Sequence, residues 1–328
     1  MMDPELAAVA AVLPRPAAVD PVAARLRMRE FLGHLAADAK AAGSDGLTIS
    51  DRPVPGPSGA PAIRVRLYEP RHRQANAPCL VYFHGGGFMA GDLDSEHVRC
   101  VRLSAQSDCV VVSVDYRLAP EHPFPAAVED CYAALSWTAA NADDLGIDGS
   151  RVGVGGVSAG GGLAAAVALM ARDRGGPVVA FQMLMFPVLD DRMETASMTF
   201  VGTPLFDGPA AARMWSSYLD GNRSSISPYA APARAEDLRG LPPTYLATGE
   251  FDPLRDEGIE YALRLLAADV SVELHNFAGT FHTFDVFPTA ASTRAANEQI
   301  EWLRRIAHRM KGSWPEESIQ QSTDGAST

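Results

Sequence analysis

Apolar runs of strand length alternate with helical patterns along most of the chain. Residues 79–83 and 109–115 are apolar, β-branched runs, and a helix-like stretch over 125–140 separates the second from a further run at 151–155. Strands that are apolar throughout and alternate with helices are typical of a mostly parallel sheet covered on both faces. The pattern therefore predicts a doubly wound α/β fold.

The same alternation continues toward the C-terminal end. A glycine- and alanine-rich helix is expected from residue 159 to about residue 173. Because successive elements usually lie beside one another, the later elements extend the same sheet and its helical layers. They are strands over 178–186, 243–248 and 270–277, and helices over 254–268 and 297–310.

The N-terminal part follows a different pattern. Residues 20–42 are expected to form a helix, because Asp20 can cap it, Pro21 fits its first turn and apolar residues recur on one side. Residues 43–60 are rich in glycine and proline and are interpreted as a connector. Strict alternation over 63–68 predicts an edge strand with one face in water.

Residues 189–232 interrupt the alternation. The segment is too long for a simple connection, and its methionine and aromatic residues predict an inserted helical lid, although each of them alone is more simply explained as the core of that lid. The organisation we expect is N-terminal cap helices (1–45), a first part of an α/β core (46–188), the inserted cap segment (189–232), a second part of the core (233–311) and a polar, disordered tail (312–328).

Composition limits the class of protein. A chain of 328 residues with 47% hydrophobic residues can bury a sizeable core in one large domain with an insertion. No uncharged apolar run reaches about 18 residues, and no basic stretch precedes the first short apolar run, so we expect a cytoplasmic protein without a membrane span. The net charge of −12 disfavours nucleic acid and anionic membrane as partners and leaves small neutral substrates open.

The four cysteines are Cys79, Cys100, Cys109 and Cys131, and they show no C-x-x-C spacing. Because two of them lie in or beside strand-like runs, buried thiols are favoured over disulfides or a metal site. We expect no metal and no cofactor.

Two short glycine-rich motifs follow strand-like runs, HGGG at 84–87 and GVSAG at 156–160. The second fits a nucleophile elbow, a sharp strand-to-helix turn that presents a serine, and the first fits a loop whose backbone N–H groups stabilise an oxyanion. Ser158 is therefore the candidate nucleophile, with a structural turn serine as the alternative. His84 precedes Ser158 and is interpreted as structural.

The chain order serine, acid, histidine narrows the choice of base. Of the eight histidines, three follow the strand over 243–248. His275 falls inside the strand over 270–277 and His308 in the terminal helix, whereas His282 is on a loop. His282 is the candidate base, and a surface or helix-capping histidine is the alternative.

Asp252 is the candidate acid, because it directly follows the strand over 243–248. Asp190 and Asp191 follow the preceding strand and compete for this role, although they open the expected lid, and Glu250 is also close. Asp252 can also cap the helix that follows it, a duty expected to compete with its orientation toward the base.

These residues predict acyl transfer to a serine. His282 would accept the Ser158 proton during attack on an acyl carbon, and Asp252 would hold the imidazole in the required tautomer. The oxyanion would be held by the backbone N–H groups of Gly85, Gly86 and Ala159.

Two further motifs make the chain similar to a known family. VDYRLAPEHPFPAA at 114–127 and DPLRDEG at 252–258 occur in order with the glycine motifs. With them, the chain resembles the bacterial hormone-sensitive-lipase-like (family IV) esterases of the α/β-hydrolase superfamily over most of its length. It departs from the family pattern at Val157, where many members carry an acidic residue, and at 94–97, where an acid and a histidine are transposed.

The resemblance implies a serine carboxylesterase that hydrolyses short- to medium-chain acyl esters without a cofactor, under a helical cap, and often as a homodimer. A lactonase or an amidase would use the same machinery, because the motifs do not encode the leaving group. A non-catalytic small-molecule receptor on the same fold is the third alternative. The intact set of Ser158, Asp252 and His282 argues against the receptor.

Overall fold

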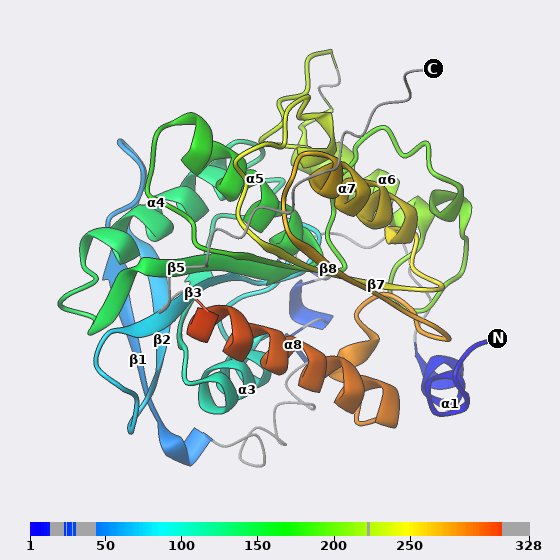
Figure 1. The fold of residues 1–328 in the computed structure, drawn as a ribbon. Helices are drawn as coiled ribbons and strands as arrows, with labels where there is room; N and C mark the ends of the chain where they lie inside the picture. The colour runs from blue at the N-terminus through cyan, green and yellow to red at the C-terminus, as the bar shows by residue number, and fades with distance from the viewer. Residues whose placement is uncertain (14–22, 24, 28, 31–43, 222–223, 310–328) are drawn as a thin grey trace, which may run out of the picture.

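A single twisted sheet forms the centre of the molecule (Figure 1). The computed structural model describes residues 1–13, 23, 25–27, 29–30, 44–221 and 224–309. In these residues eight strands pair in the order β1-β2-β4-β3-β5-β6-β7-β8, antiparallel from β1 to β4 and parallel from β4 to β8. Their bounds are β1 Leu47–Val54, β2 Ile63–Pro70, β3 Ala77–Phe83, β4 Val110–Asp115, β5 Ile147–Val157, β6 Gln182–Met185, β7 Thr244–Gly249 and β8 Val272–Phe277.

Helices cover both faces of this sheet (Figure 1). One layer contains α3 and α8, with α1 at its side, and the other contains α4, α5 and α7, with α6 beyond them. The predicted α/β fold, doubly wound on a mostly parallel sheet, is therefore confirmed. The helices are α1 Pro4–Val12, α3 His97–Ser107, α4 Ala126–Ala140, α5 Ala159–Asp173, α6 Gly208–Tyr218, α7 Arg255–Ala267 and α8 Ala290–Arg309, with 3-10 turns η2 Ser44–Gly46, η3 Ala196–Thr199, η4 Pro232–Arg234 and η5 Phe284–Val286.

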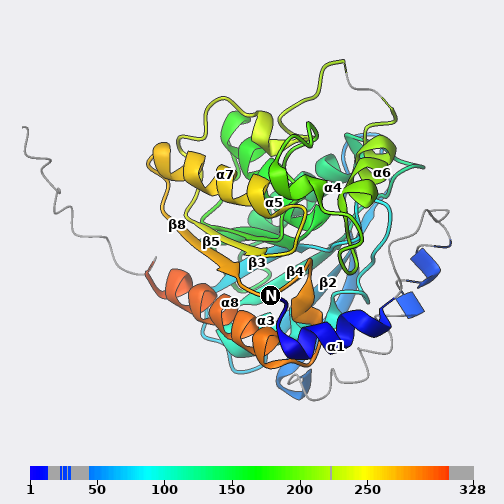
Figure 2. The ribbon, with the colours of Figure 1, turned by 90° about the vertical axis from the view of Figure 1, so that its right-hand side faces the viewer.

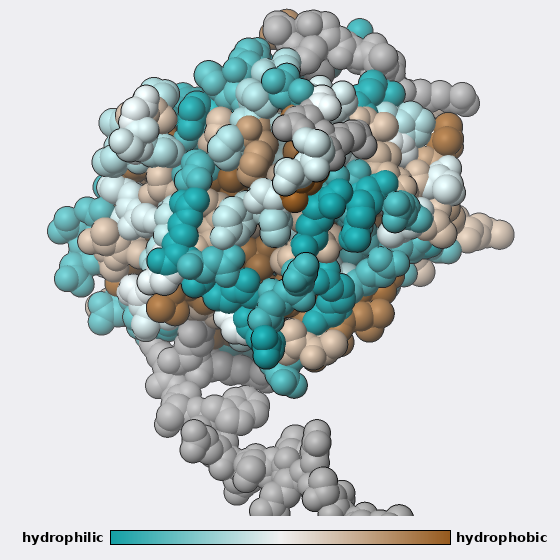
Figure 3. All heavy atoms as spheres, turned by 90° about the horizontal axis from the view of Figure 1, so that it is seen from above, coloured by the Kyte–Doolittle hydropathy of each residue, from teal (hydrophilic) through white to brown (hydrophobic). Residues whose placement is uncertain are grey.

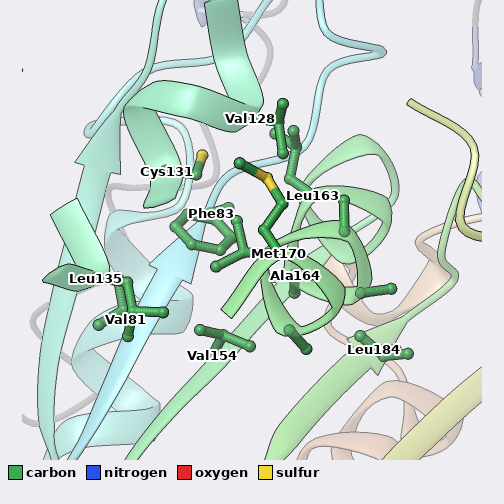
Figure 4. Close-up of a cluster of buried hydrophobic side chains, with 14 of the residues drawn as sticks. Val81, Phe83, Val128, Cys131, Leu135, Val154, Leu163, Ala164, Met170 and Leu184 are labelled. Carbon is green, nitrogen blue, oxygen red and sulfur yellow. The ribbon is translucent and has the colours of Figure 1, made fainter. Parts of the chain in front are cut away.

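The alternation of side chains in β3 explains why this strand is apolar throughout. Val81 and Phe83 belong to the hydrophobic cluster of the α4–α5 face, and Leu80 and Tyr82 belong to the cluster of the α3–α8 face. Figure 4 shows Phe83 among side chains of α5. The small residues of α5 let this helix lie close to the sheet, and every residue from its start to Ala171 is buried.

The first strand was not expected. β1 occupies residues that were interpreted as a connector, and it forms the edge of the sheet, so the prediction that the strand over 63–68 lies at an edge is wrong. Most side chains of β1 are at least partly exposed. Its stability therefore comes from the backbone ladder with β2, which hydrophobic periodicity does not reveal.

The expected helix over 20–42 falls mostly outside the described residues. Those that are described within it are helical, and two of their arginines form ion pairs, Arg25 with Glu121 and Arg29 with Asp92. The expected disordered tail, 312–328, also lies outside the described residues. The division of the chain into cap and core segments stays a prediction.

The described residues of the inserted segment 189–232 include α6 and the turn η3, and the turn η4 begins at its last residue. It lies in the layer of α5 and α7 (Figure 1). Figure 3 views this side of the molecule from above and shows hydrophilic surface interspersed with smaller hydrophobic areas. α6 packs inward, since Met214, Trp215 and Tyr218 are buried in the cluster on this face.

Candidate active site

Ser158 lies on the sharp turn between β5 and α5. Its φ of 58° and ψ of −119° belong to a region that residues with a side chain rarely adopt. A Cβ on Gly156 would lie 2.5 Å from the carbonyl of Gly160, and a Cβ on Gly160 would overlap the carbonyl oxygen of Phe83, so both positions require glycine. The Ser158 N–H donates to the carbonyl of Met185 at 2.8 Å and fastens the turn to β6.

Ser158, His282 and Asp252 form one chain of hydrogen bonds. His282 Nε2 lies 2.9 Å from Ser158 Oγ, and His282 Nδ1 lies 2.8 Å from Asp252 Oδ2. Ser158 and His282 are each 5% exposed, and Asp252 is fully buried. Asp252 follows β7 and His282 follows β8, so parallel strands deliver both side chains to the edge where Ser158 lies. The structure thus brings together the three residues that the sequence singles out.

Asp252 uses its two carboxylate oxygens for different partners. Oδ2 faces His282, whereas Oδ1 accepts the backbone N–H of Leu254 at 2.9 Å. The helix α7 begins at Arg255 and Asp252 is not its N-cap. The competition expected between capping and orientation is therefore absent. Asp252 does not cap α7, and the oxygen that accepts from Leu254 is not the oxygen that faces His282.

The competing carboxylates are engaged elsewhere. Asp190 pairs with Arg192 at 2.7 Å, and Asp191 pairs with Arg234 at 2.5 Å. Glu250 accepts the backbone N–H of Gly279 at 2.6 Å, at the start of the loop that carries His282. Of the candidate acids, Asp252 is the one that the structure places against His282.

Two aromatic rings surround the imidazole of His282. Phe206, from the inserted segment, lies with its ring centroid 4.9 Å away, and Phe186, from the end of β6, meets it edge-on at 6.0 Å. The next residue, Thr283, has a φ of 52° and precedes the turn η5. The aromatic packing restricts the rotation of the ring while leaving Nε2 directed at Ser158.

The glycine-rich loop lies against the nucleophile. A Cβ on Gly85 would be 3.7 Å from Ser158 Cβ and 3.2 Å from the Val157 side chain. Gly86 has a φ of 115°, and a Cβ there would overlap the backbone of Ala90. Because Ala159 is the first residue of α5, its N–H has no acceptor within the helix and remains available beside Ser158.

His84 is buried below this loop. Its ring stacks on Tyr116 at 4.0 Å, the Tyr116 hydroxyl donates to the His84 carbonyl at 2.8 Å, and His84 Nδ1 lies 2.7 Å from the carbonyl of Gly85. Burial lowers the pKa of His84, so the ring is neutral at pH 7. These contacts support the interpretation of His84 as scaffold.

Comparison with known proteins identifies the family of this chain. Residues 80–286 match the family described as the alpha/beta hydrolase fold. The chain is 43% identical to Esterase LipI of Mycobacterium tuberculosis over 80% of this chain and 83% of the relative, and 38% identical to Carboxylesterase NlhH of the same organism over 87% and 89%. A solved structure of a bacterial heroin esterase superposes with a TM-score of 0.88 at 48% identity, over 93% of this chain and 98% of its own. The chain belongs to the hormone-sensitive-lipase-like family.

This family IV esterase is a carboxylic ester hydrolase, as its named relatives indicate over most of their length.

The four cysteines are buried and free, and burial raises the pKa of each thiol. Such thiols are protonated and poorly reactive at pH 7. No helix in the described part of the chain is both long and apolar enough to span a membrane.

One group of side chains has ligand atoms close enough to hold a metal ion. Glu273, His275 and Glu298 place theirs within 4.8 Å of one another on β8 and α8. Glu273 already pairs with Arg305 at 2.6 Å and with His275 at 3.0 Å. The group has no part in the chain of hydrogen bonds around Ser158.

Sequence reasoning missed the residues that support the site. Phe206 is one of several aromatics in the inserted segment, and Glu250 was considered only as a rival acid. The sequence signal that could have indicated a supporting role for Glu250 is its position two residues before Asp252, on the loop that follows β7. Nothing in the sequence distinguishes Phe206 from its neighbours.

Proposed function

We propose that this esterase hydrolyses short- to medium-chain acyl esters with Ser158 as nucleophile, His282 as base and Asp252 as the orienting carboxylate. The observation that carries the proposal is the unbroken chain of hydrogen bonds from Ser158 Oγ to Asp252 Oδ2. A serine hydroxyl is a poor nucleophile until a positioned base can take its proton during the attack.

In the acylation half-reaction, Ser158 Oγ attacks the ester carbonyl carbon while its proton passes to His282 Nε2. The tetrahedral intermediate collapses as the bond to the alcohol oxygen breaks, and His282 returns the proton to that oxygen. Water then attacks the acyl-serine, again giving a proton to His282, and collapse releases the carboxylic acid and restores the Ser158 hydroxyl. Asp252 keeps the Nδ1 proton in place and stabilises the transient imidazolium.

The oxyanion of each intermediate would be held by the backbone N–H groups of Gly85, Gly86 and Ala159. The close approach of Gly85 to Ser158 Cβ supports this assignment. The Ser158 N–H is already donated to Met185, so Ala159 is the donor that the elbow can supply. Removing one such donor typically slows turnover by about 10²- to 10³-fold.

Two apolar side chains support a small, neutral substrate. Phe206 occupies space directly beside His282, and Met214 of α6 contacts the position where a Cβ of Gly87 would lie. Both are apolar, which suits a short acyl chain more than a charged group. The similarity to a bacterial heroin esterase supports an ester as the substrate class.

The test is turnover of p-nitrophenyl esters by Ser158→Ala, with Ser216→Ala as a control at an exposed serine of α6. We expect Ser158→Ala to lose about 10⁴- to 10⁶-fold in kcat while remaining folded, and Ser216→Ala to match the parent. A fluorophosphonate should label the parent and Ser216→Ala and spare Ser158→Ala. Turnover retained by Ser158→Ala would contradict the proposal, and an unlabelled, inactive parent protein would favour a receptor.

Acyl preference needs a separate measurement. Esters with acyl chains from about two to about sixteen carbons should give the highest kcat/KM in the lower half of the range, and matched lactones and amides should react more slowly. A maximum at the longest chains would contradict the expected size class. Faster turnover of the lactone or the amide would replace the ester as the substrate class.

A further inference from the structure

The loop that carries His282 is held at both ends by the N-terminal helix. At its start, the Asp3 N–H donates to the carbonyl of Gly279 at 2.9 Å. At its end, Glu5 Oε2 accepts the N–H of Ala290, the first residue of α8, at 2.8 Å. Figure 2 shows α1 alongside the orange segment that leads from β8 into α8. The two hydrogen bonds bracket His282 in the chain.

The sequence of α1 is suited to this contact. Asp3 caps the helix, since its side chain accepts the N–H groups of Glu5 and Leu6, and Pro4 occupies the first turn. This cap leaves the Asp3 N–H pointing away from the helix and toward Gly279. Glu5, one residue into α1, caps α8 by accepting the N–H of Ala290, which has no acceptor within α8 because it belongs to the first turn.

Packing reinforces the two hydrogen bonds. Leu6 is fully buried in the cluster that contains Phe281 and Phe284, the neighbours of His282 in the sequence. Gly279 has a φ of 75°, and a Cβ there would lie 2.8 Å from the Asp3 backbone nitrogen. The absence of a side chain at Gly279 therefore allows the loop to lie this close to the start of α1.

The opposite side of the same loop is fixed by the segment that carries Asp252. Glu250 accepts the Gly279 N–H, and the Phe251 N–H donates to the carbonyl of Thr280 at 2.8 Å. The loop thus lies between the Asp252 segment and α1. The contacts with Glu250 and Phe251 hold the His282 loop beside the segment of Asp252. The contacts with Asp3 and Glu5 hold the same loop from the side of α1.

We propose that residues 1–13 are a positioning element for the reaction, and that Glu5 and Asp3 hold His282 at hydrogen-bond distance from Ser158. The inference rests on the proposed role of His282 as the base. Acyl transfer needs the proton acceptor in place at the moment of attack, so a loop that samples more positions lowers the fraction of productive complexes. The loss should appear in kcat, because α1 holds the base and has no assigned contact with substrate.

The experiment compares Glu5→Ala, Glu5→Gln and Glu260→Ala in the full chain. Glu5→Ala removes the acceptor for Ala290 and should lower kcat about 3- to 10-fold with KM changed by less than about twofold. Glu5→Gln keeps a side-chain oxygen acceptor and should restore most of the rate. Glu260, on an exposed position of α7, is the matched control and should have no effect.

Two further readouts separate positioning from general stability. The rate of Ser158 labelling by a fluorophosphonate, measured well below the thermal midpoint, should fall in parallel with kcat, and the proton resonance of the His282 Nδ1–H hydrogen bond should broaden in Glu5→Ala. Gly279→Ala, which pushes against Asp3, should act in the same direction.

The outcomes distinguish this inference from the proposed function. If Ser158→Ala is inactive and Glu5→Ala turns over at the parent rate, the positioning role is wrong and the serine mechanism stands. If Glu5→Gln loses as much as Glu5→Ala, the hydrogen bond to Ala290 is not the cause and the inference also fails. Turnover retained by Ser158→Ala would remove the basis of both.

Discussion

Asp252 binds His282 through Oδ2 alone, at 2.8 Å, and keeps Oδ1 for the N–H of Leu254 at 2.9 Å. The same side chain therefore orients the proposed base and fastens the turn that leads into α7. The two duties are separable by mutation, because an asparagine retains one oxygen and an alanine retains none.

Asp252→Asn should lose catalysis and keep most of the stability. The amide can still accept from Leu254, but its NH₂ faces His282 and disfavours the tautomer that accepts the Ser158 proton, so kcat should fall about 10³- to 10⁴-fold. Asp252→Ala should lose a similar factor and, in addition, about 1 kcal/mol of the free energy of unfolding. Ester turnover and urea unfolding of the pair test this, and equal stabilities would show that the Leu254 hydrogen bond contributes little.

The three triad residues could be predicted because they follow from chain order and strand ends. Ser158, Asp252 and His282 each follow a strand, Ser158 directly and the other two on the loops after β7 and β8, and parallel strands deliver their carboxyl ends to one edge. The different hydrogen-bond partners of the two Asp252 carboxylate oxygens could not be predicted, since they depend on side-chain geometry at the scale of single ångströms.

The residues of α1 that hold the His282 loop could not be predicted either, and the reason is different. Glu5 and Ala290 are far apart in the sequence, and neither belongs to a recognisable motif. Their contact depends on where α1 packs, and a nine-residue helix gives no signal for its partner. β1 was missed in the same way, because its place in the sheet depends on pairing with β2 rather than on a pattern of its own.

Phe206→Ala should change the acyl preference. The ring lies 4.9 Å from that of His282, so its removal opens space beside the reacting atoms and loosens the imidazole. We expect kcat/KM for the shortest esters to fall and the optimum to move by about two to four carbons toward longer chains.

Phe200→Ala is the matched control for this change. Phe200 belongs to the same inserted segment, but its ring packs on Arg255 at 5.3 Å and not on His282. The control should keep the preference of the parent. An identical shift in both variants would mean that the inserted segment as a whole, and not Phe206, determines acyl length.

Arg99→Met should destabilise the protein most at neutral pH. Asp285 is buried, and burial raises its pKa, but the charge and hydrogen bonds of Arg99, at 2.5 Å and 3.1 Å, outweigh this and hold the pKa below its ordinary value of 3.8. A carboxyl with a lowered pKa contributes stability above that ordinary value and loses it as the pH falls. Removing Arg99 leaves a buried unpaired carboxylate and should cost about 3–5 kcal/mol at pH 7.

The penalty of Arg99→Met should shrink toward pH 4, where Asp285 can take up a proton. Urea unfolding at several pH values measures the difference from the parent. The double variant Arg99→Met with Asp285→Leu is the control. It should recover part of the loss because the charge of Asp285 is gone, and only part because Glu96, which pairs with Arg99 at 2.9 Å, still lacks its partner. A penalty that is the same at pH 4 and pH 7 would show that packing, and not charge, is the contribution of Arg99.

Glu257, in contrast to Asp285, is a buried carboxyl without a cationic partner among the described residues. Its Oε1 accepts the N–H groups of Leu189 at 2.7 Å and of Asp190 at 3.3 Å, and its Oε2 has no hydrogen-bond partner in the described structure. Burial, reinforced by the negative charge of Asp190, raises the pKa of Glu257 well above its ordinary value of 4.5, although the hydrogen bond from Leu189 opposes the shift. The neutral acid is therefore the form that the fold favours.

Glu257→Gln should consequently become more stable than the parent as the pH rises. For a carboxyl with a raised pKa, the stability contribution is complete below pH 4.5 and declines as the pH rises toward the pKa of the folded state. Glutamine keeps the oxygen that accepts from Leu189 and does not titrate, so the two proteins should be equal near pH 4. At pH 8 the variant should have the larger free energy of unfolding, because only the parent has then lost the stability that the proton of Glu257 contributes.

Urea unfolding from pH 4 to pH 8 tests whether the stabilities of Glu257→Gln and the parent diverge as the pH rises, with Glu260→Gln as the control. Glu260 is exposed on the same helix, so its substitution should shift the free energy of unfolding by less than about 0.5 kcal/mol at every pH. Glu257→Leu removes the acceptor for both backbone N–H groups and should be less stable than the parent throughout. If the Glu257→Gln and parent curves run parallel, Glu257 titrates alike in the folded and unfolded chain, and its burial carries no electrostatic penalty.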